Sequence, residues 1–564
     1  MQIDKKVHKR ERLLKVLIKT GITTLICILL LLGCTSNNNS PNLVPQSSGT
    51  SPNYWCTWYW QNYLIKKGEK VDNPDSKNVY TNSAARNELT QESVFGKDGM
   101  AVVILPKTRS DYYFLIDHGW QNKRIKNNTF FTGIMDTLDF PKYAHLEPKD
   151  RIKQMNNDIK ALGWKGLGLW YRGNPTKEYM HQLVEWSKYA GIEYWKIDGG
   201  DIGHYYATQI RDEIYPELVL EHITGTGPLN SKWDVQGLDY YPSVYSVTEQ
   251  VQQTLQSNAG TTLNKTSKKA IKSFDVIKNT DVFRTYDAAP LLVSTVTLGR
   301  VHDILAYTAG KSEYTALLNI QDDCNIAAAL GLTVGVKRHP MNTPRMYNGK
   351  DFHAQIAGDR RVDKRLNEMD RLAIWQRIAP PMKAGYGDYN YSSNNLIDSI
   401  EFQKEHTWYV ASHGKMVRQS APAVMARNIA LPEVRSNDLA PYVMASKFPN
   451  GAVAITTEGR VTPENSWIEP KADITLKEAT VNYPIGIFGH YKSLTLNFGK
   501  RLPEDIVIYA QDLLSNKAIN ITNQVSIRSA SVTIPGKLID EIGTSENDSG
   551  DISVPGMVVK IINE

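Results

Sequence analysis

Cysteine and net charge are both scarce in this sequence. Only 4 cysteines occur among its 564 residues, too few for a disulfide-rich scaffold. The formal net charge is +6, and residues 1–19 supply seven basic and two acidic side chains, so only +1 remains for the rest of the chain. Because no basic excess remains, we expect no nucleic acid partner.

A long apolar run is also lacking. The apolar stretch at residues 22–32 is short for a bilayer-spanning helix, and it follows the charged residues 1–19. It runs into a Leu-Leu-Gly-Cys sequence at residues 31–34, which resembles the bacterial lipobox, whose cysteine is acylated. The pattern predicts a lipoprotein signal peptide over residues 1–33, and an exported protein anchored to a membrane by lipid on Cys34. It would lie at the periplasmic face or the cell surface, and an uncleaved N-terminal anchor is the alternative.

The segment that follows is too polar to form a core. Residues 34–53 are rich in Asn, Ser, Pro and Gly, which predicts a flexible tether. Roughly 510 residues remain for two or three folded domains. Of the cysteines, Cys56 and Cys324 would belong to this folded part, either as a disulfide or as buried free thiols.

Residues 54–396 alternate short apolar runs with amphipathic stretches, the pattern of βα units around a parallel sheet. The clearest crossover helix is Pro148–Leu162, and a last helix is expected at Arg361–Ile378. Eight strands predict a (β/α)₈ TIM barrel. The candidate strands are Tyr54–Tyr59, Tyr112–Asp117, Gly166–Tyr171, Glu193–Asp198, Glu217–His222, Val282–Asp287, Ala316–Gln321 and Thr333–Arg338.

The pattern changes over residues 397–564, where short alternating segments are separated by Gly, Pro, Asn and Asp turns. This pattern predicts a C-terminal antiparallel β-sandwich. The clearest strands are Tyr442–Ser446, Val453–Thr457, Ser493–Phe498, Ile506–Ala510 and Val558–Ile562.

Polar and aromatic residues follow the predicted barrel strands, where a barrel carries its active site. The most informative strand ends in Lys196 and Asp198 and is cut short by Gly199-Gly200. Carboxylates interleaved with tryptophans suit carbohydrate, because sugars stack on indole and a glycosidic bond is cleaved between two carboxyl groups. The other strand-end residues are Asp117 to Gln121, Trp170 to Arg172, Asp201, Glu221, His222, Arg284, Asp287, Asn319, Asp322, Asp323, Arg338 and His339.

Four motifs resemble the α-galactosidase clan of glycoside hydrolases, families 27 and 36 with the raffinose-synthase-like branch, over roughly residues 54–345. They are Trp55-Cys56-Thr57-Trp58, Asp117-His118-Gly119-Trp120, Trp195-Lys196-Ile197-Asp198 and Phe283-Arg284-Thr285-Tyr286-Asp287, in the order of that clan. The resemblance implies that Asp198 is the nucleophile and Asp287 the general acid/base. The C-terminal sandwich also resembles the clan, and the absence of a large N-terminal β-domain looks more like family 27.

Further residues are expected around the sugar. The resemblance implies that Glu221 and Arg284 hold the 2-hydroxyl, although they could instead form a structural ion pair. Asp117, His118, Lys196 and Asp201 are the other polar candidates, and Trp58, Trp120 and Trp170 either stack on sugar or belong to the core. Glu221, Asp322 and Asp323 are rivals to Asp287 for the acid role.

The sequence departs from the clan at two positions. His118 replaces the second of two carboxylates that hold the 4- and 6-hydroxyls, and Tyr59 stands where the raffinose-synthase-like branch has an acidic residue. The sequence therefore predicts a retaining, exo-acting α-glycosidase without naming its sugar. In that mechanism Lys196 keeps Asp198 ionised, and no cofactor is needed.

Two other classes remain open. Asp198, Asp201 and His204 lie at three-residue spacing and, with Asp322-Asp323, could hold a metal ion in a hydrolase. Alternatively, the chain could be a catalytically silent, glycan-binding surface lipoprotein that kept the barrel. Chelator sensitivity would identify the first, and turnover of any aryl glycoside would exclude the second. The oligomeric state is not predicted.

Overall fold

The structure is a computed structural model. It describes residues 40–563 except 59, 62–81, 122–132, 173–175, 199–202, 224–273, 286–293, 341–345, 348–349, 352–363, 403–414 and 462–466. The predicted signal peptide and Cys34 lie outside these residues. Within the described part, no helix has both the length and the apolar character needed to span a membrane.

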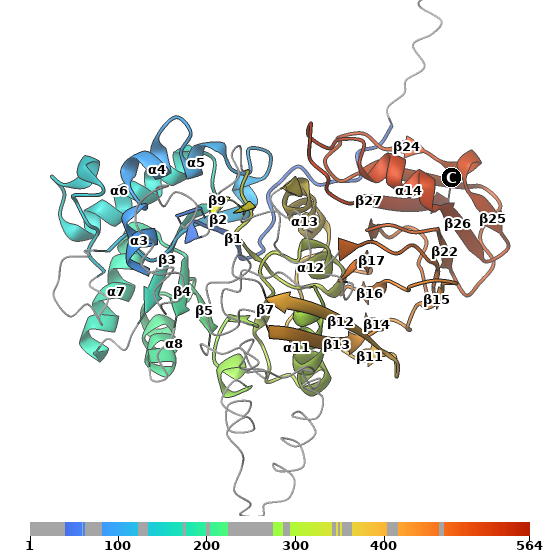
Figure 1. Cartoon of the computed structure of the whole chain (residues 1–564), viewed down its shortest axis with the longest axis horizontal. Coiled ribbons are helices and arrows are strands. Elements are labelled where there is room, and N and C mark those ends of the chain that lie inside the picture. Colours follow the sequence, from blue (N-terminus) through green and yellow to red (C-terminus); the bar gives the residue numbers. More distant parts are fainter. Residues whose placement is uncertain are drawn as a thin grey trace, which may run out of the picture. The chain divides into compact units, whose positions relative to one another are not determined.

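The described residues form an eight-stranded parallel sheet in the order β7-β6-β5-β4-β3-β2-β1-β8 (Figure 1). A bridge between Asn319 and Thr333, with Ile320 N donating to Thr333 O at 3.1 Å, joins the last two strands and closes the barrel. The predicted TIM barrel is therefore confirmed. Its strands are β1 (Asn53–Cys56), β2 (Tyr112–Ile116), β3 (Gly166–Arg172), β4 (Tyr194–Asp198), β5 (Val219–Ile223), β6 (Val282–Arg284), β7 (Leu317–Asn319) and β8 (Gly335–Val336).

Helices connect these strands. In α6 the side chains of Ile152, Met155 and Ile159 are buried at the three-to-four spacing that a helix needs to cover a sheet. The next helix, α7, ends where Gly191 adopts a left-handed backbone with φ of 66°. The described helices of this region are α3 (Asn82–Asn87), α4 (Gln91–Phe95), α5 (Met100–Val103), η1 (Arg109–Asp111), η2 (Pro141–Tyr143), α6 (Pro148–Ala161), α7 (Lys177–Ala190), α8 (Gly203–Ile214), α11 (Ser294–Thr308), α12 (Cys324–Leu330) and α13 (Asn367–Ile378).

The flexible tether predicted for residues 34–53 does not extend over residues 43–52. Residues 43–52 form an extended segment, here called the strap, that packs on the fold. Leu43 N donates to Gln511 Oε1 at 2.7 Å, and Gly49 N donates to Asp111 Oδ1 at 2.6 Å. Val44 is buried in the main hydrophobic core. Composition misled the prediction because the backbone of this segment is held by side chains of the fold rather than by a core of its own.

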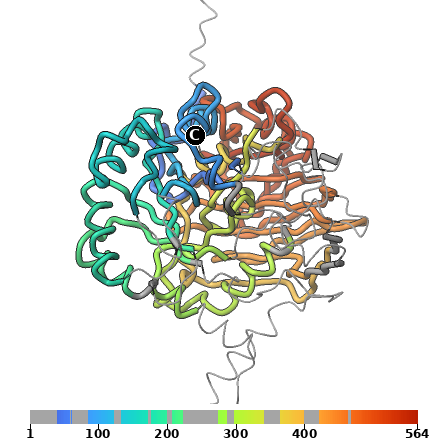
Figure 2. The backbone as a smooth tube through the Cα atoms, turned by 60° about the vertical axis from the view of Figure 1, so that its left-hand side comes forward, coloured from blue at the N-terminus to red at the C-terminus, as the bar shows by residue number. Residues whose placement is uncertain are grey.

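The C-terminal region is a sandwich of two sheets whose facing apolar side chains form one core. Figure 2 shows its strands in orange and red. Most described pairs are antiparallel, as predicted, but β14–β16, β17–β21 and β20–β22 are parallel. The first sheet contains β11 (Tyr389–Tyr391), β14 (Val424–Arg427), β16 (Tyr442–Lys447), β17 (Val453–Glu458), β21 (Ile485–Phe488), β27 (Gly556–Asn563), β23 (Ile506–Asp512) and β24 (Ile519–Asn520). The second contains β15 (Glu433–Arg435), β20 (Asp473–Leu476), β22 (Ser493–Asn497), β26 (Ser531–Pro535) and β25 (Ser526–Arg528).

Smaller elements complete the described chain. The first sandwich strand, β11, begins at Tyr389, before the boundary expected at residue 397. The remaining elements are the pair β9 (Met346–Tyr347) and β10 (Lys350–Asp351), the pair β12 (Asn395–Phe402) and β13 (Lys415–Pro422), the pair β18 (Arg460–Val461) and β19 (Trp467–Ile468), η7 (Thr522–Gln524) and α14 (Gly536–Gly543).

The barrel and the sandwich share buried contacts. Trp375 of α13 packs edge-on against Phe448 and Phe488 of the sandwich. Arg371, on the same helix, forms a buried ion pair with Asp512 of β23 at 2.7 Å. Among the described cysteines, Cys56 and Cys324 are buried free thiols, so the alternative of a disulfide between them is excluded.

Candidate active site

The carboxyl ends of the barrel strands, here called the mouth, bring together most of the described candidate residues. Asp198 ends β4, and Arg284 ends β6. Asp117 follows β2, and Glu221 lies within β5, paired in register with Lys196. Side chains alternate along a strand, so residues two apart, such as Lys196 and Asp198, share the inward face.

Among the described carboxylates at the mouth, Asp198 is the one that keeps access to solvent. Its side chain is 26% exposed, whereas the side chain of Glu221 is 0% exposed. Trp170 Nε1 donates to Asp198 Oδ2 at 3.1 Å, and Arg284 Nη2 lies 3.5 Å from Asp198 Oδ1. Each carboxylate oxygen therefore has its own partner, which fixes the orientation of the group while leaving part of it open to a substrate.

The expected pairing of Lys196 with Asp198 is wrong. Lys196 Nζ instead donates to Asp117 Oδ2 at 2.6 Å, and both side chains are buried. Burial acts to lower the pKa of Lys196, but the attraction of Asp117 outweighs it and raises that pKa above its usual value. Arg284, rather than Lys196, is thus the cation in contact with Asp198.

The carboxylate of Asp117 is largely occupied by protein donors. Besides Lys196, its Oδ2 accepts from Cys56 Sγ at 3.1 Å, and its Oδ1 accepts from His118 N at 2.7 Å. Burial favours a raised pKa for Asp117, yet Lys196 and these hydrogen bonds lower the pKa to about 2. Burial beside this carboxylate also raises the pKa of the Cys56 thiol to about 12, so the thiol stays a donor.

Three aromatic side chains form a stack beside Asp198. The ring of His118 lies 4.4 Å from Trp170 and 6.2 Å from Trp58, nearly parallel to both. Trp58 and His118 are half-buried, whereas Trp170 is buried beneath them and uses its indole N–H on Asp198. Trp58 and His118 are thus the members of the stack with surface left for a ligand.

Trp120, for which the sequence left both sugar stacking and a core position open, is a core residue. Its side chain is fully buried, and its Nε1 donates to Trp170 O at 3.0 Å. It packs edge-on against Tyr171. Sequence spacing placed Trp120 at a strand end, but the turn after Asp117, with Gly119 at φ of 128°, directs it into the core.

Glu221 is also wrongly predicted as a contact to the sugar, because its side chain is completely buried inside the barrel. It accepts hydrogen bonds from Tyr54 Oη at 3.0 Å, Tyr194 Oη at 2.7 Å and Asn319 Nδ2 at 2.7 Å. Arg284 Nε lies 3.5 Å from Glu221 Oε1, so the alternative of an ion pair is the one that the structure shows.

Asp322 and Asp323, the rivals to Asp287 for the acid role, also accept hydrogen bonds from the protein. Asp322 and Asp323 are buried. Asp322 Oδ1 accepts from the backbone N–H groups of Lys337 and Arg338, and Asp323 accepts from Thr297 Oγ1. Asp322 is occupied only in part, because its Oδ2 is buried with no hydrogen-bond partner among the described residues. Asp287, Asp201 and Tyr59 lie outside the described residues, as does the side chain of His204. Within the described part, no three His, Cys, Asp or Glu side chains are grouped as a metal site.

Sequence reasoning missed residues of the barrel interior. Tyr54 and Tyr194 hold Glu221, and the fully buried Lys337 donates to Gln321 Oε1 at 3.0 Å. Burial, with Lys196 and Arg284 nearby, lowers the pKa of Lys337 to about 8. The period-two alternation of side chains along a strand could have identified the two tyrosines as inward-facing. Tyr54 lies two residues before Cys56, and Tyr194 lies two before Lys196.

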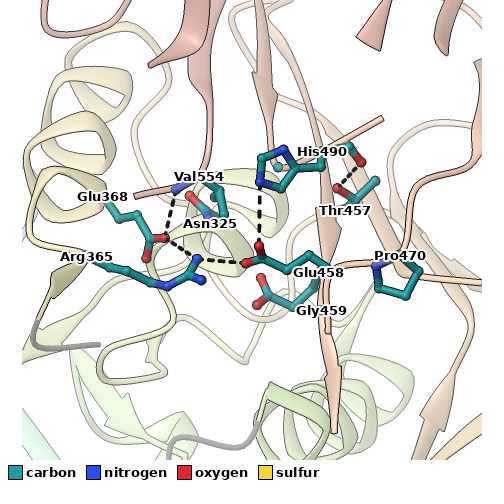
Figure 3. A pocket seen from close by; sticks show the side chains of 11 residues that line it. Asn325, Arg365, Glu368, Thr457, Glu458, Gly459, Pro470, His490 and Val554 are labelled. Carbon is teal, nitrogen blue, oxygen red and sulfur yellow. Dashed lines mark hydrogen bonds and ion pairs between the residues drawn. The ribbon is translucent and has the colours of Figure 1, made fainter. Parts of the chain in front are cut away.

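A separate pocket lies where the barrel meets the sandwich (Figure 3). Arg365 and Glu368 line it from the barrel side, and His490 lines it from the sandwich side. Arg365 pairs with Glu469 at 2.8 Å, and His490 Nδ1 lies 2.7 Å from Asp540 Oδ1. These charged groups are partners of one another, which favours a role in joining the two regions.

Comparisons with known proteins identify no family. No family model and no curated protein matches this chain. The crystal structure of a noncanonic maltogenic alpha-amylase AmyB from Thermotoga neapolitana aligns with a TM-score of 0.26 and 10% identity, over 75% of this chain and 87% of that chain. A likeness this weak carries no argument, so function has to be inferred from the geometry of the site.

Proposed function

We propose that this chain is a glycoside hydrolase, a retaining and exo-acting α-glycosidase that removes sugars from the ends of oligosaccharides or polysaccharides. The observation that carries the proposal is the setting of Asp198. It is a partly exposed carboxylate at the mouth of a closed barrel, held by Arg284 on one oxygen and by Trp170 on the other. Trp58 and His118 line the same place with aromatic faces.

In the proposed reaction Asp198 is the nucleophile. One carboxylate oxygen attacks the anomeric carbon, the glycosidic bond breaks, and the leaving oxygen takes a proton from Asp287. Water then gives a proton to the Asp287 carboxylate, adds to the anomeric carbon and releases the sugar with Asp198 restored. Arg284 is the cation beside Asp198 in this proposal, in place of Lys196.

The sugar is proposed to lie against Trp58 and His118. An indole face packs on the apolar face of a pyranose, and an imidazole nitrogen hydrogen-bonds a hydroxyl. Asp117 lies directly behind His118 but is committed to Lys196. Among the described residues no second free carboxylate lies here, which disfavours galactose as the proposed sugar around its 4- and 6-hydroxyls. Asp201 is proposed as a further polar contact.

The proposed enzyme works outside the cytoplasm, anchored by lipid on Cys34 to a membrane at the periplasmic face or the cell surface. The lipobox-like sequence at residues 31–34 supports this proposal. If it is correct, Cys34→Ser should abolish labelling by a fatty-acid probe and release the protein from membranes, and continued labelling would refute it.

A substrate screen tests the proposed function. The protein is offered a panel of aryl α-glycosides and α-linked oligosaccharides, and NMR follows the anomeric proton of the first product. We expect turnover with retention of configuration, abolished by Asp198→Ala. Inversion would contradict a double displacement. Binding of glycans without turnover would favour the silent lectin-like alternative, and loss of turnover with a chelator would favour a metal-dependent hydrolase.

A further inference from the structure

Glu221 is one of the best-anchored side chains in the described barrel. Its two oxygens accept three hydrogen bonds, from Tyr54, Tyr194 and Asn319. The orientation of the Asn319 amide is determined by its other contacts, because its Oδ1 accepts from the backbone N–H groups of Gln321 and Gly335. A carboxylate held in this way is an immobile negative charge.

Close packing keeps this charge in place. A Cβ at Gly335 would lie 2.2 Å from the ring of Tyr54, so only glycine lets Tyr54 occupy its position against Glu221. Tyr54 and Tyr194 also pack on each other, with ring centroids 5.3 Å apart. The barrel interior below the mouth thus leaves no room for Glu221 to move toward a ligand.

Arg284 lies between two carboxylates. Its Nε is 3.5 Å from Glu221 Oε1, and its Nη2 is 3.5 Å from Asp198 Oδ1. Both distances are longer than the 2.7–2.9 Å of a close, charge-assisted hydrogen bond. The guanidinium therefore attracts Asp198 without forming a close hydrogen bond to it. The lone pairs of the Asp198 carboxylate stay available for attack on the sugar.

We propose that Glu221 is a positioning residue that holds Arg284 back from Asp198, so that the nucleophile stays ionised and yet free to attack. This inference rests on the proposed function and extends it to a buried residue that cannot touch the sugar. If Glu221 lost its charge, Arg284 would shift toward Asp198 and bind it more tightly. The nucleophile would become more strongly ionised but less reactive.

The test compares Glu221→Gln with the wild type on the aryl glycoside of highest turnover. We expect kcat to fall about tenfold or more with KM changed less than about threefold, because Asp198 becomes less reactive while the contacts that bind the substrate are unchanged. The acid limb of the pH profile should move to lower pH, because a tighter guanidinium favours the ionised form of Asp198. A merely structural defect would not move that limb.

The matched control is Glu193→Gln. Glu193 precedes β4 at the opposite end of the barrel and also accepts from a tyrosine, Tyr113 Oη, at 3.0 Å. This variant should keep the wild-type kcat and pH profile. If Glu221→Gln fails to fold, Tyr194→Phe replaces it: Glu221 keeps its charge but loses one donor, so it should attract Arg284 more strongly and the acid limb should move to higher pH.

Two results would overturn the inference. A raised KM with unchanged kcat would show that Glu221 contacts the substrate, and wild-type kinetics with an unmoved acid limb would show that its charge is irrelevant. A crystal structure of Glu221→Gln gives a readout without turnover, because Arg284 Nη2 should come closer to Asp198 Oδ1 than 3.5 Å. An unchanged distance would refute the inference. Because this readout does not need turnover, it distinguishes failure of the inference from failure of the proposed function.

Discussion

At the scale of residues, the candidate nucleophile depends on partners that differ from those expected. Asp198 is oriented by Trp170 and Arg284, while Lys196 neutralises Asp117. A hydrogen bond from a buried indole is directional, and an arginine stays charged at any working pH. The reactive carboxylate therefore has a permanently charged partner in Arg284, although it also interacts electrostatically with the lysine two residues before it.

The indole of Trp170 should matter through its N–H. Trp170→Phe removes the donor to Asp198 Oδ2, and a hydrogen bond to a charged group contributes about 1.5–3 kcal/mol, so kcat should fall roughly ten- to a hundredfold. Steady-state kinetics on an activated aryl glycoside measures this, with Trp164→Phe as a control because its Nε1 donates to Ala101 O elsewhere in the barrel wall. A rise in KM alone would instead make Trp170 a sugar-stacking residue.

Lys337 should destabilise the fold at neutral pH. Burial lowers its pKa to about 8, below the value near 10.4 of an unfolded chain, so the folded state holds this proton less tightly. The loss of folding stability amounts to roughly 3 kcal/mol below pH 8 and disappears as the pH rises toward about 10.4. Lys337→Met should therefore stabilise the protein at pH 7 more than at pH 10. Urea unfolding at both values measures the difference, and an equal effect at the two would contradict the assignment.

At the scale of elements, the hydrophobic pattern of the sequence predicted where the strands lie better than it predicted which side chains contact one another. Each of the eight barrel strands overlaps one of the short apolar runs from which it was predicted. A buried strand leaves such a local pattern in the sequence. Which side chains meet across the barrel depends on register and on the turn after each strand. For this reason the Lys196–Asp117 pair and the burial of Glu221 were missed, and the core position of Trp120 was only one of two alternatives.

The strap was also missed, and it should stabilise the folded unit. Arg377 Nη1 donates to Pro45 O at 3.2 Å and Lys165 Nζ to Ser51 O at 2.9 Å, in addition to the contacts of Leu43 and Gly49. Four hydrogen bonds at about 0.5–1.5 kcal/mol each amount to about 2–6 kcal/mol. A chain that starts at residue 53 should melt below one that starts at residue 40. Equal melting temperatures in calorimetry would show that the strap does not stabilise the fold and is only a tether.

At the scale of the whole molecule, the barrel and the sandwich depend on each other. A single hydrophobic cluster includes Trp375 of the barrel together with Met444 and Phe488 of the sandwich. The ion pair of Arg371 with Asp512 is buried between them, and both partners are almost inaccessible to solvent. Burial of a shared core couples the folding of its two sides.

The two regions should therefore unfold together. Asp512→Ala leaves the Arg371 charge buried without its partner, which costs about 3–5 kcal/mol. Calorimetry should show one transition in the wild type and one transition at lower temperature in the variant. Two separate transitions, with only one of them shifted, would show that the barrel and the sandwich are independent domains.

The central claim is that Asp198 is the nucleophile of a retaining glycosidase, and covalent trapping tests it most directly. The protein is incubated with a fluorinated, activated glycoside of the sugar that the screen identifies, quenched in acid, digested and analysed by mass spectrometry. We predict one glycosyl unit on the peptide that contains Asp198, and none in Asp198→Ala. A glycosyl unit on another residue, or turnover that survives in Asp198→Ala, would contradict the account.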